Sequence, residues 1–396
     1  MMERRKNLND KFGFAVVMKY NLLKDIAEIN MGQSPDSLSY NNVKRGLPFY
    51  QGNADFGELY PIAKTWCDAP KKTAKKNDIL ISVRAPIGAI NYTSELCCIG
   101  RGLAAITVED DIDRNYIYYF LKAINSELIN QGTGSTFKAI GRPVLEMLKV
   151  PAISEKQKIL IIKSMDFLVD IIKLRKKELI LLDELIKARF VEMFGNPVLN
   201  DKEWKQEPLR KLATKIGSGA TPKGGKDTYR KEGISFIRSM NVHNGQFEYK
   251  DLAHISYEQA TQLDNVTIEP NDVLLNITGA SVARCCIVPA DILPARVNQH
   301  VCIVRCNDSI MAKFLNYLLI DNNCQDLLWN IAGSGATREA ITKQQIENLP
   351  IILPPFELQQ QFEGFVEQVD KSREEVKKSL EKTQQLYDSL MQEYFG

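Results

Sequence analysis

The stretch Gly132-Thr133-Gly134-Ser135-Thr136 decides how this chain is organised, because it returns as Gly333-Ser334-Gly335-Ala336-Thr337. The same offset of 201 residues, from 132 to 333, relates the dipeptide Phe194-Gly195 to Phe395-Gly396. Solenoid repeats have units of about 20 to 50 residues, so this period is too long for a solenoid. We therefore expect a whole domain followed by a helix, present twice, with a function that comes in pairs.

Three further markers appear in the same order in both halves. They are Gly32-Gln33-Ser34-Pro35, Gly46-Leu47-Pro48-Phe49-Tyr50-Gln51 and Asn77-Asp78-Ile79-Leu80-Ile81-Ser82 in the first half, and Gly219-Ala220-Thr221-Pro222, Gly233-Ile234-Ser235-Phe236-Ile237-Arg238 and Asn271-Asp272-Val273-Leu274-Leu275-Asn276 in the second. Glycine and proline between β-branched runs predict short strands joined by irregular loops. Residues 116–123 and 314–320 are expected to be helical. The fold class is therefore α+β or α/β, with a twisted sheet in each globular unit.

Two charged segments carry apolar residues at three-and-four spacing, the pattern of a coiled-coil helix. These residues are Ile162, Met165, Val169, Ile172, Leu179, Leu182 and Ile186, then Phe362, Phe365, Val369, Val376, Leu380, Leu390 and Tyr394. Neither proline nor glycine interrupts residues 155–194, which predicts a helix of about 60 Å. An antiparallel pairing of the two helices would give a pseudo-twofold dumbbell. The alternative is a pair of general oligomerisation seams.

The expected domain limits follow from these patterns. Residues 1–152 form a first globular domain, 153–195 a first spacer helix, 196–353 a second globular domain and 354–396 a second spacer helix.

The composition is that of a water-soluble globular protein, with 44% apolar and 25% charged residues among 396. No run of eighteen apolar residues suggests a membrane span, so we expect a cytoplasmic protein with no membrane partner. The eight cysteines contain no CxxC pair, which favours reduced core residues over a zinc site. A net charge of +2 predicts weak DNA binding unless partner subunits add phosphate contacts.

Catalytic motifs are missing from the sequence. Residues 219–227 fail the spacing of a phosphate-binding loop, and neither HExxH nor GxSxG occurs. The glycine pairs at 132/134 and 333/335 are too short for a dinucleotide fingerprint. We therefore expect no catalysis, no metal and no cofactor on this chain.

Polar and basic residues recur near the glycine-rich loops of both halves. Arginine, asparagine and glutamine read base edges through paired hydrogen bonds, whereas lysine holds phosphates. The candidate DNA-binding residues are Gln51, Asn53, Arg84, Arg101, Lys138, Arg142, Thr221, Lys223, Arg238, Asn241, Arg284, Arg296, Gln299, His300 and Arg338. A solvated surface charge is the plain alternative for any one of them.

The ordered markers resemble those of the specificity (S) subunits of type I restriction-modification systems. Gly219-Ala220-Thr221-Pro222-Lys223 is similar to part of the family's target-recognition-domain pattern, and residues 353–360 are similar to its apolar-Pro-Pro-x-x-x-Gln segment. The first half departs from the pattern, because residues 151–155 lack the double proline and Gln33-Ser34 replaces Ala-Thr. The resemblance covers essentially the whole chain.

This resemblance implies a non-catalytic protein in which each target-recognition domain reads one half of a split, asymmetric double-stranded DNA site. The helices would set the spacing and dock two methyltransferase (M) subunits, and motor-endonuclease (R) subunits would join for cleavage. S-adenosylmethionine, ATP and magnesium are expected on those partners. Two half-sites about 10 base pairs apart, centre to centre, would lie on one face of the duplex. The bases themselves cannot be read from the sequence.

Two other functions stay open at this point. One is a methyltransferase or nuclease whose motif is disguised, which would act on DNA as a purified chain. The other is a dumbbell scaffold that links two proteins without touching DNA.

Overall fold

The structure is a computed structural model that describes residues 19–134, 138–222, 224–225, 229–333 and 339–396. It divides into two compact units, Met1–Lys176 with Lys378–Gly396, and Lys177–Lys377. Two helices of 40 residues, α6 (Glu155–Phe194) and α11 (Phe356–Phe395), each contribute one end to the first unit and the other end to the second. Each unit therefore contains a globular part and the ends of two helices.

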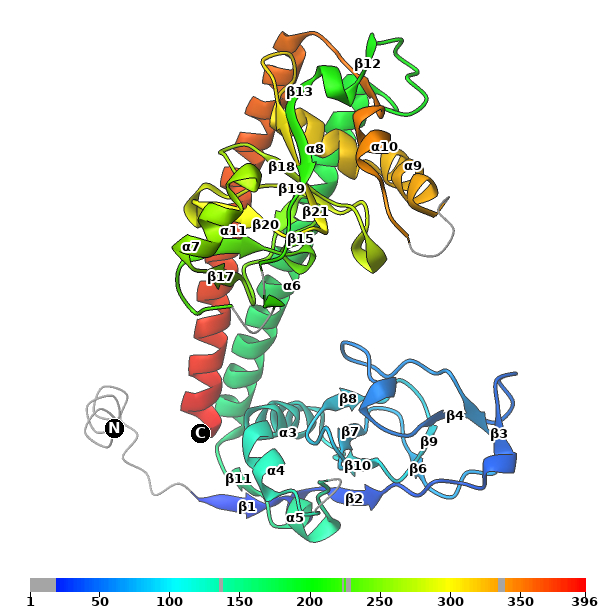
Figure 1. The fold of residues 1–396 in the computed structure, drawn as a ribbon. Coiled ribbons are helices and arrows are strands. Elements are labelled where there is room, and N and C mark those ends of the chain that lie inside the picture. The colour runs from blue at the N-terminus through cyan, green and yellow to red at the C-terminus, as the bar shows by residue number, and fades with distance from the viewer. Residues whose placement is uncertain (1–18, 135–137, 223, 226–228, 334–338) are drawn as a thin grey trace, which may run out of the picture. The chain divides into compact units, whose positions relative to one another are not determined.

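The first unit is built around a four-stranded antiparallel sheet (Figure 1). Its strands are, in spatial order, β2 (Glu28–Met31), β10 (Leu103–Thr107), β7 (Ile79–Ser82) and β8 (Ile90–Tyr92). Successive side chains of a strand point to opposite faces. Accordingly Ile79 and Ile81 join a core with the helices, while Leu80 joins a smaller core on the other face. Burial of both faces explains why β7 reads as an unbroken apolar run.

A second sheet in the first unit covers the face on which Leu80 lies. Its strands are, in spatial order, β3 (Tyr40–Asn41), β5 (Trp66–Cys67), β4 (Leu47–Tyr50), β9 (Cys97–Ile99) and β6 (Thr73–Ala74). β4 and β9 are parallel, and the other pairs are antiparallel.

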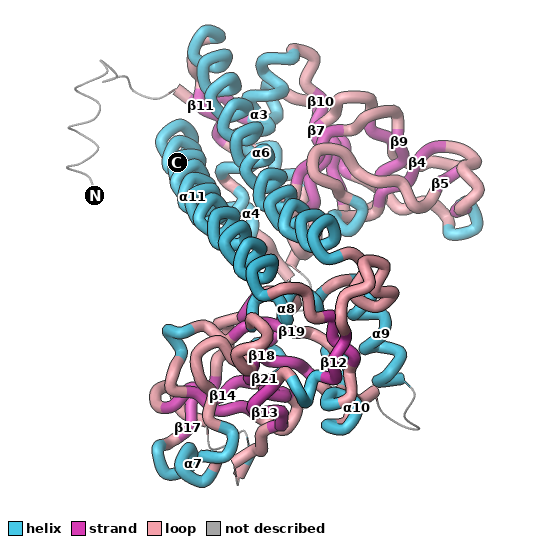
Figure 2. The backbone as a smooth tube through the Cα atoms, turned by 90° about the horizontal axis from the view of Figure 1, so that it is seen from above, coloured by secondary structure: helices cyan, strands magenta, loops and turns pink. Residues whose placement is uncertain are grey.

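Helices cover the opposite face of the first sheet. They are α3 (Asp111–Ala123), α4 (Asn125–Gln131) and α5 (Arg142–Glu146), while a short helix α2 (Leu23–Ile26) follows β1 (Tyr20–Leu22), which pairs with β11 (Lys149–Pro151). The start of α6, through Ile162 and Met165, and the end of α11, through Met391 and Phe395, belong to the same core. The two helices therefore run in opposite directions in this unit (Figure 2).

The second unit repeats this architecture. Its four-stranded sheet has the order β13 (Ala213–Ser218), β21 (Val301–Cys306), β18 (Val273–Asn276) and β19 (Cys285–Ile287). A three-stranded sheet has the order β17 (Ala253–Ile255), β14 (Ile234–Ile237) and β20 (Ala295–Val297), with β14 and β20 parallel. Two further pairs are β12 (Gln206–Pro208) with β22 (Pro350–Ile352), and β15 (Val242–His243) with β16 (Gln246–Phe247).

Helices α8 (Ala312–Ile320), α9 (Asn322–Gly333) and α10 (Lys343–Glu347) of the second unit correspond to α3, α4 and α5 of the first. A further helix, α7 (Tyr257–Gln262), follows β17. Phe190 and Phe194 at the end of α6 and Phe362 at the start of α11 pack with Phe314 of α8, with neighbouring ring centroids 4.8–5.8 Å apart. The two long helices are again antiparallel where they meet this unit.

The repeated Phe-Gly dipeptide fastens a helix end in each unit. Phe194 lies 4.8 Å from Phe314, and Phe395 lies 5.3 Å from Tyr116 at the corresponding place in α3. Gly195 has φ +74°, a conformation that glycine adopts readily at the end of a helix, and its N–H donates to Val191 O at 2.8 Å. The dipeptide thus combines a buried anchor with a helix stop.

These observations confirm the mixed α/β class, the duplicated unit and the two long helices. The helix expected over residues 155–194 has those bounds, and the helices expected near 116–123 and 314–320 lie within α3 and α8. The domain limits and the pseudo-twofold arrangement stay predictions. In the described part of the chain, no helix contains an apolar stretch long enough to cross a bilayer.

The cysteines lie in the interior, as expected. All eight are free thiols, and only Cys306 is more than slightly exposed. Burial raises the pKa of Cys286 and Cys302 to about 12, so these thiols stay protonated and unreactive at neutral pH.

Candidate nucleic-acid interface

The carboxyl ends of several strands meet at one edge of the first unit. β10 is antiparallel to β2 and β7, so the ends of those two strands meet the start of β10. β4 and β9 are parallel and end side by side. The loops that leave these ends, together with residues 138–140, form what we call the first rim (residues 32–34, 51–53, 83–84, 100–102 and 138–140).

Four backbone hydrogen bonds hold the first rim together. Gly32 N donates to Leu103 O at 2.9 Å, and Gly100 N donates to Tyr50 O at 2.8 Å. Val83 N donates to Gly102 O at 2.9 Å, and Ile140 N donates to Val83 O at 2.9 Å.

The second unit forms the same rim from residues 219–221, 238–239, 277–279, 298–300 and 339–341. Its four bonds are the counterparts of those above: Gly219 N to Val301 O at 3.3 Å, Asn298 N to Ile237 O at 3.0 Å, Ile277 N to His300 O at 3.0 Å and Ile341 N to Ile277 O at 2.8 Å. The two rims therefore share a backbone framework although their side chains differ.

A glycine is required where each rim begins. A Cβ at Gly32 would lie 2.2 Å from Gly100 O, and a Cβ at Gly219 would lie 1.8 Å from Val297 O. Both separations are far below any real contact, so only glycine allows the end of β2 or β13 to pass this close to the neighbouring turn. This explains why a glycine opens the first marker in both halves.

Most candidates of the first half lie on the first rim. Gln51, Arg84, Arg101 and Lys138 are exposed there, and Asn53 begins a short 3-10 helix beside Gln51. The backbone N–H of Arg101 donates to Ser34 Oγ at 3.4 Å.

Arg142 differs from this group. It is the first residue of α5, and its Nε donates to Glu146 Oε1 at 2.7 Å. Because Arg142 already forms an ion pair with Glu146, it is a weaker candidate for a DNA contact.

The second rim carries a linked set of polar side chains. Thr221 Oγ1 donates to Gln299 Oε1, and Gln299 Nε2 lies 3.3 Å from His300 Nε2. The other ring nitrogen of His300, Nδ1, lies 2.6 Å from Thr278 Oγ1. Such a chain of contacts orients the Gln299 amide before any ligand arrives.

A surface pocket of about 450 Å³ adjoins this set of side chains. It is lined by Ser239, Met240, Thr278, Gly279, Ala280, Ser281, Arg284 and His300. The structure therefore brings the candidates Arg284 and His300 together at one pocket. Hydroxyl, guanidinium and imidazole groups around a shallow hollow suit a polar ligand such as a nucleic-acid phosphate or a base edge.

Arg238 is part of the second rim, and its side chain already makes contacts within the protein. Its guanidinium lies 5.4 Å from the ring centroid of Tyr229, and Nη2 donates to Asp251 O. Nε is buried and has no hydrogen-bond partner in the described residues. These contacts fix the direction of the Arg238 guanidinium and leave some of its N–H groups without a hydrogen bond in the described part of the chain.

Two candidates are placed in the interior, which corrects the expectation for them. Asn241 is completely buried, and its amide donates to Glu248 O at 2.9 Å and accepts from Arg238 N at 3.1 Å. Arg296 is 8% exposed and bonds Ala260 O at 3.1 Å and Asp264 Oδ1 at 3.0 Å. Both side chains stabilise loops, and sequence gave no sign of it because burial depends on distant segments. Lys223 and Arg338 lie outside the described residues.

The recurring Asn-Asp marker is also structural. Asn77 and Asn271 have φ +71° and +67°, in the left-handed region that asparagine tolerates. Asp78 Oδ2 accepts from Lys75 N at 2.7 Å, and Asp272 Oδ2 accepts from Glu269 N at 2.8 Å. The marker therefore specifies the turn that precedes β7 and β18.

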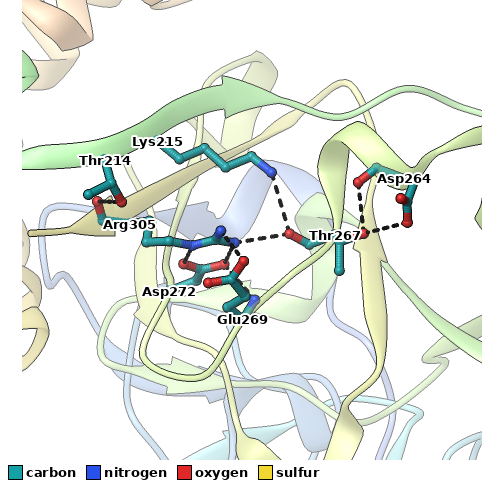
Figure 3. Close-up of polar contacts among 7 residues, drawn as sticks. All are labelled: Thr214, Lys215, Asp264, Thr267, Glu269, Asp272 and Arg305. Atoms are coloured by element: carbon teal, nitrogen blue, oxygen red, sulfur yellow. Dashed lines mark hydrogen bonds and ion pairs between the residues drawn. The ribbon is translucent and has the colours of Figure 1, made fainter.

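In the second unit the aspartate of this marker anchors a polar cluster (Figure 3). Arg305 Nε and Nη2 donate to the two carboxylate oxygens of Asp272 at 2.8 and 2.9 Å, and Nη2 also donates to Thr267 O at 3.1 Å. Glu269 accepts from the same guanidinium, and Lys215 Nζ reaches Thr267 O at 3.5 Å. The cluster neutralises itself and lies at the opposite end of β18 from the rim.

Sequence reasoning missed Ser34 and Thr278, which hold the Arg101 backbone and the His300 ring. In the sequence, Ser34 stands out only because Gln33-Ser34 replaces Ala-Thr in the pattern of target-recognition domains. Thr278 follows an apolar strand, where threonine is an ordinary β-residue. Only the meeting of distant loops reveals their positions.

Both halves of the chain match a known protein family. Residues 18–184 and 201–385 each match the family described as type I restriction modification DNA specificity domain. The chain is 40% identical over 152 residues to a protein of Methanocaldococcus jannaschii named as a type I restriction enzyme MjaX specificity subunit, a match that covers 38% of this chain and 36% of that protein. It is 23% identical over 375 residues to the type I restriction enzyme MjaIX specificity subunit of the same organism, covering 87% of this chain and 85% of the relative.

Solved structures share the fold over nearly the whole chain. The type I restriction-modification S subunit from M. genitalium matches with a TM-score of 0.57 and 13% identity, covering 97% of each chain. A chain from a study of complex assembly and conformational transition of the type I R-M system matches with a TM-score of 0.62 and 17% identity, covering 95% of this chain and 97% of that one.

The chain therefore belongs to the family of type I restriction-modification DNA specificity proteins, and it contains the family's domain twice. Recognition of a DNA sequence is the function that this membership gives it.

Proposed function

We propose that the chain reads a bipartite, asymmetric site in double-stranded DNA, one half with each rim. The observation that carries the proposal is the pair of rims. Each rim is held by four backbone hydrogen bonds at equivalent positions, but the two rims present different side chains. Because the backbone of the two rims is alike, we expect both to dock on DNA in the same way. Because their side chains differ, we expect them to read different bases. The half-sites should therefore be unlike, and the gap between them should depend on the spacer helices.

Partner subunits are the second part of the proposal. Leu160, Phe167 and Leu174 lie seven residues apart along α6 and are 64%, 66% and 65% exposed. A seven-residue spacing places side chains on one face of a helix, and such an exposed apolar stripe marks a protein contact. We assign this stripe to the docking of a methyltransferase subunit; two such subunits and motor-endonuclease subunits complete the assembly.

The chain itself would perform no chemistry. The motifs for nucleotide binding and hydrolysis are missing from its sequence, so S-adenosylmethionine, ATP and magnesium belong to the partners in this proposal. A net charge of +2 supports the same division, because partners would have to supply most phosphate contacts. The assembly would work in the cytoplasm, where the DNA is.

Genome-wide mapping of methyladenine tests the proposal. The chain is expressed with its methyltransferase partner in cells that lack other adenine methylation. A single motif of two unlike halves separated by a fixed gap is expected. An uninterrupted motif, or methylation that does not depend on this chain, would contradict the proposal. Methylation or cleavage of DNA by the purified chain alone would instead favour a disguised enzyme.

The alternative function, a scaffold that does not touch DNA, is tested by removing arginine charges from the second unit. Changing Arg238, Arg284 and Arg338 together to glutamine should weaken DNA binding by the assembled complex at least tenfold, since each lost phosphate or base contact reduces affinity. The matched control changes Lys202, Arg210 and Lys211, which are exposed and lie outside the second rim. Equal affinity of both triple variants would favour the scaffold.

A further inference from the structure

We propose that one side chain at the apex of a single turn in each unit selects a base: Arg101 before β10 in the first, and Gln299 before β21 in the second. This inference rests on the function proposed above and adds to it the residues that determine specificity. It also assigns the base that each residue reads.

The two turns are equivalent in their backbone bonds. In the first unit Leu103 N donates to Gly100 O at 3.0 Å, and in the second Val301 N donates to Asn298 O at 3.3 Å. Arg101 and Gln299 each occupy the second position of a turn closed in this way. Each turn follows the strand that lies parallel to β4 or β14, so the same elements of the sheet support it.

One neighbour of each apex residue is committed to the fold. Next to Arg101, a Cβ at Gly102 would lie 2.2 Å from Gln51 O, so this position carries no side chain. Next to Gln299, Asn298 is 7% exposed and its Oδ1 accepts from His300 N at 3.0 Å. In the first turn the apex residue is therefore the side chain that the backbone geometry leaves free to face a ligand. In the second turn the apex residue Gln299 is exposed, beside the half-buried ring of His300 that lines the pocket.

The free hydrogen-bonding groups at the two apices differ. Within the described residues, the guanidinium of Arg101 has neither a hydrogen bond nor an acidic partner, and all its donors are available. The Gln299 amide accepts from Thr221 and contacts His300, which leaves one N–H and one oxygen lone pair. One free N–H donor and one free oxygen acceptor are what the Gln299 amide needs to form two hydrogen bonds with one base.

These groups match particular bases. Arginine bonds guanine O6 and N7 through two parallel donors, and glutamine bonds adenine N6 and N7 through one donor and one acceptor. We therefore assign a guanine to Arg101 in one half-site and an adenine to Gln299 in the other. Loss of a bidentate contact reduces discrimination at a base pair by roughly tenfold to a hundredfold.

Exchanging the two residue types tests the assignment. Arg101→Gln and Gln299→Arg are made separately in the full chain and expressed with the methyltransferase partner, and methyladenine is mapped across the genome. Arg101→Gln should change one guanine of one half-site to adenine, or relax it, and leave the other half-site unchanged. Gln299→Arg should change one adenine of the other half-site to guanine. The controls are Arg45→Gln and Gln262→Arg, both at exposed positions away from the rims.

The possible failures can be told apart. A wild-type complex without a bipartite motif would overturn the proposed function itself. A wild-type bipartite motif that both exchanges leave unchanged, with full methylation, would overturn the apex assignment alone. If an exchange abolishes methylation, the folded complex is used to select DNA from a library with randomised half-sites. A changed base at one position of the selected motif supports the assignment, and an unchanged motif overturns it. Where a variant fails to fold, Arg101→Lys and Gln299→Asn are put through the same selection, with relaxation at one position expected.

Discussion

Arg305 grips both carboxylate oxygens of Asp272, at 2.8 and 2.9 Å, from the neighbouring strand. The corresponding pair in the first unit is Asp78 and Thr107, which occupy the same places before β7 and at the end of β10. The repeated Asn-Asp dipeptide therefore has an arginine partner in one unit and a threonine neighbour in the other. Mutation of the two aspartates should therefore have different effects.

Asp272→Asn should destabilise the second unit. Asp272 is completely buried, and the change would leave the Arg305 guanidinium without its main counterion. Breaking such a buried pair costs about 3 kcal/mol. Urea unfolding measures the loss, and Asp68→Asn is the control because the Arg45–Asp68 pair is largely exposed and should contribute less than about 1 kcal/mol.

Asp78→Asn should change how stability depends on pH. Burial raises the pKa of Asp78 above its ordinary value, against opposing hydrogen bonds from Thr107 and Lys75. The folded state then holds its proton to higher pH than the unfolded state, so the wild type loses stability as pH rises from about 4 through the folded pKa. An asparagine oxygen still accepts from Lys75 N and cannot ionise. Melting temperatures from pH 4 to 7 should show a growing advantage for the variant, and a constant difference would contradict the mechanism.

Gly219→Ala should disrupt the second rim. The new Cβ would overlap Val297 O, and relieving the overlap requires a backbone shift that costs about 2 kcal/mol. Gly217→Ala is the matched control, because nothing lies within 4 Å of a Cβ there. We expect Gly219→Ala to lower the melting temperature and to relax one half-site, while the control preserves both half-sites. A relaxed motif in both halves would argue against two independent rims.

Lengthening α6 tests its role as a spacer. Four residues inserted between Lys176 and Lys177 add about one helical turn. Methyladenine mapping should then show a changed gap with both half-sites intact. The same four residues appended after Gly396 serve as the control. Altered bases with an unchanged gap would exclude the spacer role.

Sequence predicted those parts of the fold that depend on local patterns. The helix of residues 155–194 follows from its apolar spacing and its lack of proline and glycine, and the duplicated unit follows from ordered markers. The order β13-β21-β18-β19 does not follow, because it depends on which distant segments pair.

The candidate interface divides in the same way. Arg101 and Gln299 were chosen for their chemistry, and both lie on turns at a rim. Asn241 and Arg296 have the same chemistry but are buried. Arg296 occupies the strand position that Cys98 fills in the first unit, so its ion pair with Asp264 replaces an apolar side chain. Only tertiary contacts distinguish these cases.

The glycines and backbone bonds that shape each rim have a consequence for evolution. Since the turn is fixed by main-chain atoms, the side chain at its apex is not required for folding. Substitutions there are expected to be nearly neutral for stability, so a lineage could drift among DNA targets through single-codon changes while the scaffold and its partners stay the same.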